Sequence, residues 1–290
     1  ATCMSSTATR KGYIYGFITV FMWAGFVLLS RMAQASGLNS FDMTALRFGT
    51  ASLLLFPAWL FWQRVPLFTL QTLILSAVGG IGYALCAYSA FHFAPASHGA
   101  VLLSGVLPLF VTLVAWFLLG EKPSAQRWLA LTVIGGGVLC LAFYSVGDLQ
   151  QSWPGDLLLL ASSCLWAFYS VLAKRWVKTP KEITISVGLL SALIYLPCYW
   201  LLLPKGIHHA TWGAILLQAF FQGVLVVIVA MLTFMQAMEQ LGPTRLGAVM
   251  ATVPAFAGIG AVVFLGEHFS WLLVSGLLLT CGGAWLGSRS

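Results

Sequence analysis

The chain has 290 residues, of which 60% are hydrophobic and only 7% charged, and its mean hydropathy is +0.94. A soluble domain carries about 25% charged residues, so this composition excludes a water-soluble fold. The net charge of +7 would suit nucleic acid, but the basic residues lie in short breaks between apolar segments, mostly on one predicted side. We therefore read the charge as a topology signal, and expect a lipid bilayer and no nucleic acid as partner.

The apolar residues gather in ten segments, each close to the 20 or so residues that a membrane-spanning helix needs. Their hydrophobicity is continuous, without the two-residue alternation of a membrane β-barrel. The expected spans are 12–31, 41–62, 71–93, 97–119, 125–144, 154–174, 182–203, 211–237, 244–265 and 270–287. The predicted fold is an all-α integral membrane protein with ten transmembrane helices.

The distribution of Lys and Arg predicts the orientation of these helices. Eleven of the 14 basic residues fall on one predicted side, and only Arg31, Arg47 and Lys205 fall on the other. Because loops rich in Lys and Arg stay in the cytoplasm, both termini are expected there.

A long pattern occurs twice in the chain and divides it into two halves. A Pro, a Leu-Gly-Glu triplet and a Gly-Gly pair recur at one offset: Pro108, 119–121 and 136–137 match Pro254, 265–267 and 282–283. The predicted units are 12–144 and 154–287, joined near 147–154. Since each has five spans, the second must enter the membrane in the opposite sense. Such an inverted repeat is typical of transporters that alternate between inward-open and outward-open states.

In the first span, Trp23 lies near the middle, and its twin in the sixth span is Trp166. Tryptophan usually prefers the membrane interface, so these deep positions need an explanation. One interpretation is that both rings line a central cavity, and the other is packing between helices. In the second span, Arg47 lies about a turn inside the outer end. We expect its charge to reach the interface or to pair with Asp42.

The third span carries several glycines together with Tyr83, Tyr88 and His92. Tyr88 and His92 are one turn apart on the same helix face. His92 is able to titrate near neutral pH, so it is a candidate for binding a carboxylate or passing a proton. Its position near the outer end favours a solvated side chain instead. His98 is expected in a loop.

The fourth and ninth spans each contain a proline, Pro108 and Pro254. Proline removes a backbone hydrogen bond and kinks a membrane helix, and the freed carbonyls need partners or a wet cavity. The paired kinks are candidate hinges beside the substrate site. Ser104, Thr112 and Thr252 lie nearby, either bonded to those carbonyls or in contact with a ligand. Glu121 and Glu267 are expected to cap the helices that follow them.

Two further spans carry polar stripes. The sixth has Ser162, Trp166, Tyr169 and Ser170 at helical spacing. In the eighth, Gln218, Gln222, Thr233 and Gln236 are expected to share one face, which should turn away from lipid. Contacts with other helices and contacts with a polar solute remain alternatives for this face.

Several kinds of chemistry have no counterpart in the sequence. No Asp or Glu is clearly mid-membrane, with Glu239 the nearest exception, and no phosphate-binding GxxxxGK[ST] segment occurs. No catalytic set or metal-ligand spacing is visible, and the six cysteines form no CxxC pair. We expect no enzyme activity, no cofactor and no metal. Without a buried carboxylate, transport is expected to follow the substrate gradient, or to couple to protons through His92.

At this point the residues resemble a known family. Two five-span halves, each with Pro, then Leu-Gly-Glu, then a Gly-rich span, are similar to the EamA branch of the drug/metabolite transporter superfamily over residues 12–287. The spacing and aromatic content are most similar to YddG-type aromatic amino-acid exporters. This resemblance implies a multi-pass protein of the bacterial inner membrane, a cavity between the halves and export of amino acids and related metabolites.

The predicted function is thus a secondary transporter that exports aromatic and other neutral amino acids by alternating access. Aromatic rings would contact the side chain of the substrate, and polar groups or backbone dipoles would contact its charged ends. The candidate substrate-binding residues are Trp23, Tyr83, Tyr88, His92, Ser104, Trp166, Tyr169, Gln218, Gln222 and Thr252. The alternatives are a carrier of nucleotide sugars, organic phosphates or cationic drugs, and a non-transporting scaffold. A monomer is expected.

Overall fold

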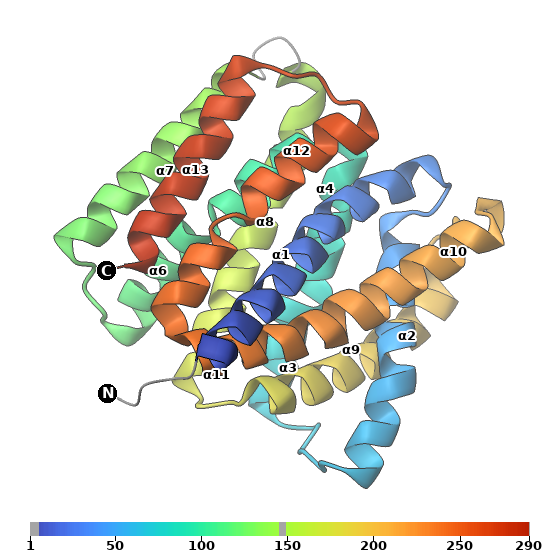
Figure 1. The fold of residues 1–290 in the computed structure, drawn as a ribbon. Helices are drawn as coiled ribbons and strands as arrows, with labels where there is room; N and C mark the ends of the chain where they lie inside the picture. The colour runs from blue at the N-terminus through green and yellow to red at the C-terminus, as the bar shows by residue number, and fades with distance from the viewer. Residues whose placement is uncertain (1–5, 145–148, 290) are drawn as a thin grey trace.

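The structure is a computed structural model that describes residues 6–144 and 149–289. Within these residues every regular element is a helix (Figure 1). Nine of the helices described are long and apolar enough to cross a membrane, and a shorter apolar helix at Ala125–Leu141 makes a tenth. The predicted all-α membrane fold is confirmed.

The helices follow the ten predicted segments, and α11 runs from the eighth into the ninth across Gly242, whose φ of 74° and ψ of 170° are not helical. The symbol η marks 3₁₀ or π-helical pieces. The first half contains α1 (Ser6–Ala35), α2 (Ser40–Phe61), α3 (Leu70–Leu75), η1 (Ser76–Gly82), α4 (Tyr83–Phe93), α5 (Ala96–Gly99), η2 (Ala100–Gly105), α6 (Leu107–Leu119) and α7 (Ala125–Tyr144). The second half contains α8 (Leu149–Arg175), α9 (Pro180–Leu202), η4 (Ile207–His209), α10 (Trp212–Gln218), η5 (Ala219–Val229), α11 (Ala230–Met250), α12 (Val253–Leu265) and α13 (Trp271–Ser288). Part of the predicted join, 145–148, lies outside the described residues.

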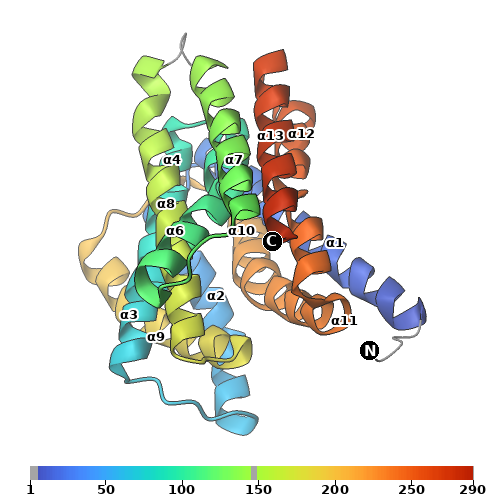
Figure 2. The same cartoon turned by 90° about the vertical axis from the view of Figure 1, so that its left-hand side faces the viewer.

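The two halves exchange packing partners. The first helix of each half, α1 or α8, packs along the third span of the other half, at α11 or α4. The second helices α2 and α9 pack together, and so do the last helices α7 and α13. Figures 1 and 2 show α7 beside α13, and Figure 1 shows α1 running along α11. The main core cluster accordingly draws residues from both halves.

The third span of each half is widened into a π-helix at the same place, as η1 and η5. Each widened turn carries a glycine against the second helix of the other half. A Cβ on Gly80 would lie 2.4 Å from the Ser191 hydroxyl of α9, and one on Gly223 would lie 2.6 Å from Cβ of Thr50 in α2. π-helical turns often mark functional sites, and here they bring two helices of opposite halves into close contact.

The repeated motif forms the same turn twice. Gly120 and Gly266 end α6 and α12 with φ of 71° and 67°, a left-handed conformation that glycine adopts without strain. Pro108 and Pro254 occupy the second residue of α6 and α12, where a missing N–H removes no helical bond. The fourth and ninth spans are therefore interrupted and restarted, at Val106 and at 251–252, and not merely kinked.

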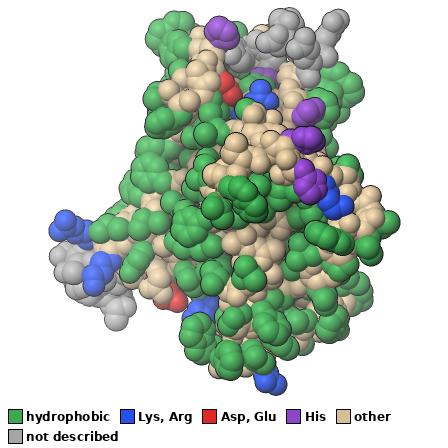
Figure 3. All heavy atoms as spheres, turned by 90° about the vertical axis from the view of Figure 1, so that its right-hand side faces the viewer, with side chains coloured by type: hydrophobic (Ala, Val, Ile, Leu, Met, Phe, Trp, Pro, Cys, Tyr) green, Lys and Arg blue, Asp and Glu red, His purple; other side chains and the backbone are tan. Residues whose placement is uncertain are grey.

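Large hydrophobic side chains cover the outside of the helix bundle. Phe117, Leu201 and Phe264 are among those more than three-quarters exposed. On the face shown in Figure 3, hydrophobic side chains dominate and Lys and Arg are few. Exposed apolar surface on this scale suits lipid and not water.

Candidate functional site

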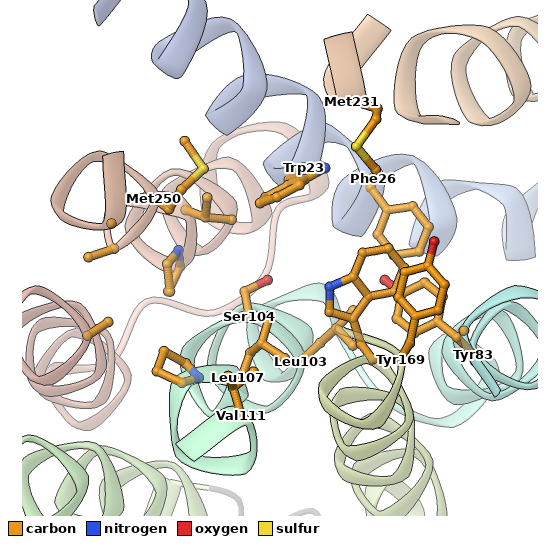
Figure 4. A pocket seen from close by; sticks show the side chains of 18 of the residues that line it. Trp23, Phe26, Tyr83, Leu103, Ser104, Leu107, Val111, Tyr169, Met231 and Met250 are labelled. Carbon is orange, nitrogen blue, oxygen red and sulfur yellow. The ribbon is translucent and has the colours of Figure 1, made fainter. Parts of the chain in front are cut away.

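A cavity of about 360 Å³ lies between the two halves, within the range of small-molecule sites. Both halves contribute its lining, including both of the interrupted spans. Figure 4 shows Trp23 on one side of the open space and the rings of Phe26, Tyr83 and Tyr169 on the other. The side chain of Ser104 lies below Trp23 in this view.

One wall of the cavity is a continuous group of aromatic rings. The ring centroid of Trp166 lies 4.7 Å from that of Tyr83 and 4.9 Å from that of Tyr169. Tyr83 in turn stacks on Phe26 at 6.1 Å. These separations are those of favourable aromatic pairs, so the wall is a rigid apolar surface with two hydroxyl groups.

Trp23 and Trp166 are twins in the repeat, and both line the cavity. Trp23 also packs on Phe234 of α11, with ring centroids 5.6 Å apart. The two interpretations of these deep tryptophans therefore coincide, since each ring packs against a neighbour and faces the cavity. Pro108, Pro254 and Ser104 line it as well.

Tyr169 is seated against a glycine of the widened turn η1. A Cβ on Gly79 would lie 2.1 Å from Cδ2 and 2.2 Å from Cγ of the Tyr169 ring. Any larger residue at position 79 would push the ring out of its place. The glycine of the third span thus positions an aromatic side chain that comes from the other half.

The two threonine hydroxyl groups near the interruptions are bonded to the backbone. Thr112 Oγ1 donates to the carbonyl of Pro108 at 2.8 Å, and Thr252 Oγ1 donates to that of Val249 at 2.7 Å. Thr112 lines the cavity, whereas Thr252 is not among its lining residues. These are local bonds to each residue's own helix or turn, and the Val249 carbonyl also accepts the backbone N–H of Thr252 at 3.1 Å.

Arg47 is placed differently from our expectation. Its side chain lines the cavity and is only 7% exposed, so it does not extend to the interface. Asp42 binds elsewhere, accepting from the Tyr199 hydroxyl at 2.6 Å and the Gly206 amide at 3.0 Å. Five residues on a helix turn the side chain by about 140°, which separates Asp42 from Arg47. The signal that sequence reasoning undervalued is the rule that an intramembrane arginine is a functional suspect.

Tyr88, Gln218 and Gln222 form a buried network beside the cavity and are not among its lining residues. The Tyr88 hydroxyl donates to Gln222 Oε1 at 3.0 Å, and Gln222 Nε2 donates to Gln218 Oε1 at 3.2 Å. Gln218 Nε2 continues the chain to the Leu29 carbonyl of α1 at 2.8 Å. In the structure these side chains meet other helices.

The expected polar face of the eighth span does not persist along its length. Gln218 and Gln222 are buried, but Gln236 is exposed, and Thr233 bonds Thr19 of α1 at 2.8 Å. The π-helical turns of η5 lie between these residues, and they change the number of residues per turn. A constant helical period was therefore the wrong basis for grouping them.

The observed positions of His92, Glu239 and His98 can be compared with those that the sequence predicts. His92 is exposed at the end of α4, as expected of a solvated histidine, and Glu239 is exposed as well. His98 was expected in a loop, which is wrong. It is buried in α5, and its Nδ1 lies 2.7 Å from Asp156 Oδ1 of α8.

Glu121 and Glu267 do not cap the helices that follow them, contrary to expectation. Glu267 binds the backbone amides of Ala96 and Ser97 at the start of α5, while the Ser270 side chain caps α13. Glu121 forms an exposed ion pair with Lys174 at 2.7 Å. Both carboxylates thus bind the opposite half. Among the described residues, no three His, Cys, Asp or Glu side chains are grouped to hold a metal.

Comparison with known proteins extends over nearly the whole chain. The model of the EamA-like transporter family matches residues 10–143 and 153–289. The chain is 26% identical to the aromatic amino acid exporter YddG of Ancylobacter novellus, over 93% of this chain and 94% of that one. It is 27% identical to the threonine/homoserine exporter RhtA of Escherichia coli K12, over 78% and 74%. A crystal structure with 24% identity superposes with a TM-score of 0.64, over 98% and 99% of the two chains, a likeness of fold.

Proposed function

Because the chain belongs to the EamA-like transporter family, we propose that it exports neutral amino acids, aromatic ones among them, across the bacterial inner membrane by alternating access. The family makes it a multi-pass membrane transporter. The observation that carries the finer assignment is the aromatic wall of Tyr83, Trp166 and Tyr169 inside the cavity. The names of two relatives, exporters of aromatic amino acids and of threonine and homoserine, support the class of substrate.

The direction of access follows from the topology that the basic residues predict. The cavity reaches Arg127, Thr184 and Ser288, which lie at helix ends predicted to face the cytoplasm. On the predicted outer side, the Glu267 carboxylate and the His98–Asp156 pair join the halves. We assign this arrangement to the state that takes up cargo from the cytoplasm. Exchange of conformations between the inverted halves gives the state that releases it.

Transport in this scheme needs no ion gradient. Among the described residues that line the cavity there is no Asp, Glu or His. His92 and Glu239, the two groups considered for proton coupling, are both exposed outside it. Export then follows the substrate gradient, as facilitated diffusion.

The test is uptake of labelled phenylalanine, threonine and leucine into proteoliposomes, with and without an imposed pH gradient. We expect saturable uptake of phenylalanine that is unchanged by the pH gradient. Protein-free liposomes and an excess of unlabelled phenylalanine are the controls. If no amino acid is taken up, the substrate assignment is wrong while the family assignment stands. If uptake requires the pH gradient, facilitated diffusion is wrong.

A second candidate function has one observation in its favour. Carriers of organic phosphates need a cationic group in the cavity, and Arg47 supplies one. The same liposomes, loaded with labelled organic phosphates of increasing size, distinguish the two functions. Preference for a phosphate over phenylalanine would favour this candidate.

A further inference from the structure

Arg47 is a buried cation that faces a cavity without a carboxylate to neutralise it. Its side chain is 7% exposed, and its Nε and Nη1 have no hydrogen-bond partner. A charge within a membrane is costly, and buried donors left unpaired add to that cost. An intramembrane charge of this kind is a candidate functional site, and a ligand that accepts from these nitrogens would remove the cost.

The surroundings of Arg47 hold its guanidinium group in place from the sides. The rings of Phe26, Tyr83 and Phe48 lie with centroids 5.7, 5.9 and 6.0 Å from its Cζ. These are distances at which an aromatic ring attracts a cation. The rings lower the free-energy cost of the buried charge. They do not accept hydrogen bonds from the N–H groups, which point outward in the plane of the guanidinium.

A polar chain approaches Arg47 from behind the cavity wall. The side chain of Arg47 interacts with the hydroxyl of Tyr88, and this hydroxyl donates its hydrogen to Gln222. Gln222 is bonded to Gln218, and Gln218 to the backbone of α1. Tyr88, Gln218 and Gln222 are therefore positioning residues, which fix the orientation of Arg47 while leaving two of its nitrogens free.

We propose that Arg47 is the carboxylate subsite of the cavity, and that the cargo is a small molecule with an aromatic or branched apolar side chain at one end and a carboxylate at the other. A guanidinium group offers paired N–H donors in the plane that matches the two oxygens of a carboxylate. The aromatic wall begins directly beside it, since Tyr83 contacts both Arg47 and Trp166. The inference rests on the proposed function for its amino-acid cargo.

The charge of the cavity favours a carboxylate over the other ligands considered. A cationic drug would meet the Arg47 charge with no acidic residue among the described lining residues to offset it. A phosphate dianion would bring a second charge into a mostly apolar space, where desolvation of the unpaired charge is costly. A carboxylate matches the single charge of the buried Arg47, while the second arginine of the lining, Arg127, is only partly buried and lies at the predicted cytoplasmic end. The α-ammonium group of an amino acid is left to the aromatic faces and to Ser104.

The test separates the two ends of the cargo by using three related ligands. Phenylalanine carries both charged groups, 3-phenylpropanoate only the carboxylate, and phenethylamine only the ammonium. Binding to the purified protein is measured through the change in its tryptophan fluorescence, to which Trp23 and Trp166 in the cavity lining contribute. We expect 3-phenylpropanoate to bind about ten- to a hundredfold more tightly than phenethylamine, the range of a hydrogen-bonded ion pair. Equal binding of the two, or binding of neither, would overturn the proposal.

Variants assign the preference to one residue. Arg47→Gln should abolish the preference for the acid, and Arg47→Lys should retain part of it. Arg127→Gln, which changes the other arginine of the cavity lining, should keep the preference, and its loss there would overturn the assignment to Arg47. If Arg47→Gln does not fold, the comparison of ligands on the unchanged protein and on Arg127→Gln still decides.

Two outcomes keep this inference apart from the proposed function. If 3-phenylpropanoate binds through Arg47 but phenylalanine is not transported, the subsite stands and the amino-acid cargo is wrong. If phenylalanine is transported and Arg47→Gln keeps the preference for the acid, the function stands and the subsite is wrong. Tighter binding of phenyl phosphate than of 3-phenylpropanoate would replace the carboxylate by a phosphate.

Discussion

Glu267 and Ala96 join the two halves at the predicted outer face: Oε1 of the glutamate accepts the backbone N–H of Ala96 at 2.6 Å, and Oε2 accepts that of Ser97 at 2.9 Å. The carboxylate closes the end of α12 onto the start of the interrupted fourth span. Its twin Glu121 makes only an exposed ion pair with Lys174. The same motif therefore forms a partly buried contact in one half and an exposed one in the other, which is the asymmetry expected of the cytoplasm-facing state that we propose.

Glu267→Gln should open the predicted outer side. The amide keeps one acceptor and turns its NH₂ group toward a backbone N–H, so one charge-assisted hydrogen bond is lost. Such bonds contribute about 1.5–3 kcal/mol, so a tenfold or greater rise in opening is expected. The measurement is the rate at which an impermeant thiol reagent labels a Ser97→Cys probe in a cysteine-free background. Glu121→Gln is the control, and equal rates in the two variants would contradict the prediction.

Trp166→Ala should impair transport more than it impairs membrane insertion. The ring contacts both Tyr83 and Tyr169, and its loss leaves a gap in the wall against which cargo packs. One aromatic contact between Trp166 and the cargo would contribute about 0.5–1.5 kcal/mol, so its loss should raise the KM for phenylalanine uptake about two- to tenfold. Trp200→Ala removes a lipid-facing ring that is 72% exposed and should leave KM unchanged. A parallel loss of protein yield and transport in Trp166→Ala would indicate packing alone.

Gly79→Ala should destabilise the protein and displace Tyr169. The new methyl group would lie 2.1 Å from the ring, and the ring cannot move without disturbing its contact with Trp166. Overpacking of this kind costs about 1–3 kcal/mol. Thermal unfolding in detergent should show a lower melting temperature. Gly135→Ala in α7, where nothing lies within 4 Å of the new atom, is the matched control and should be neutral or slightly stabilising. Equal melting temperatures would refute the close contact.

Gly266→Ala and Gly120→Ala should each lower stability through the backbone alone. Both glycines have left-handed φ values, and nothing lies within 4 Å of an added Cβ at either position. The expected cost is about 1–2 kcal/mol per site, that of a left-handed conformation for a residue with a Cβ. Gly282→Ala, a helical glycine with equally open surroundings, is the reference, and its melting temperature should exceed that of both variants. A melting temperature as high in Gly266→Ala as in Gly282→Ala would show that the turn tolerates a side chain.

The positions of the aromatic candidates were within reach of sequence reasoning. Trp23, Tyr83, Trp166 and Tyr169 all lie on the cavity, because helical spacing and the repeat relate residues that are close in sequence or equivalent by duplication. Their contact with cargo is still a prediction. The grouping of Gln236 with Gln222 was wrong because the π-helical turns of η5 interrupt the period on which it relied.

The amino-acid sequence by itself indicated that this protein lies in lipid, that it has ten apolar segments and that it consists of two halves. These features depend only on composition, segment length and repetition along one chain. The tertiary structure alone decided the partners of the charged residues. Arg47 faces an aromatic cavity and not Asp42, Glu267 caps a helix of the other half, and His98 meets Asp156. Each of these contacts joins residues distant in sequence, or depends on which side of a helix faces the centre. The packing of each half against the other determines which distant residues meet and which side of each helix faces the centre. No local sequence pattern encodes this packing.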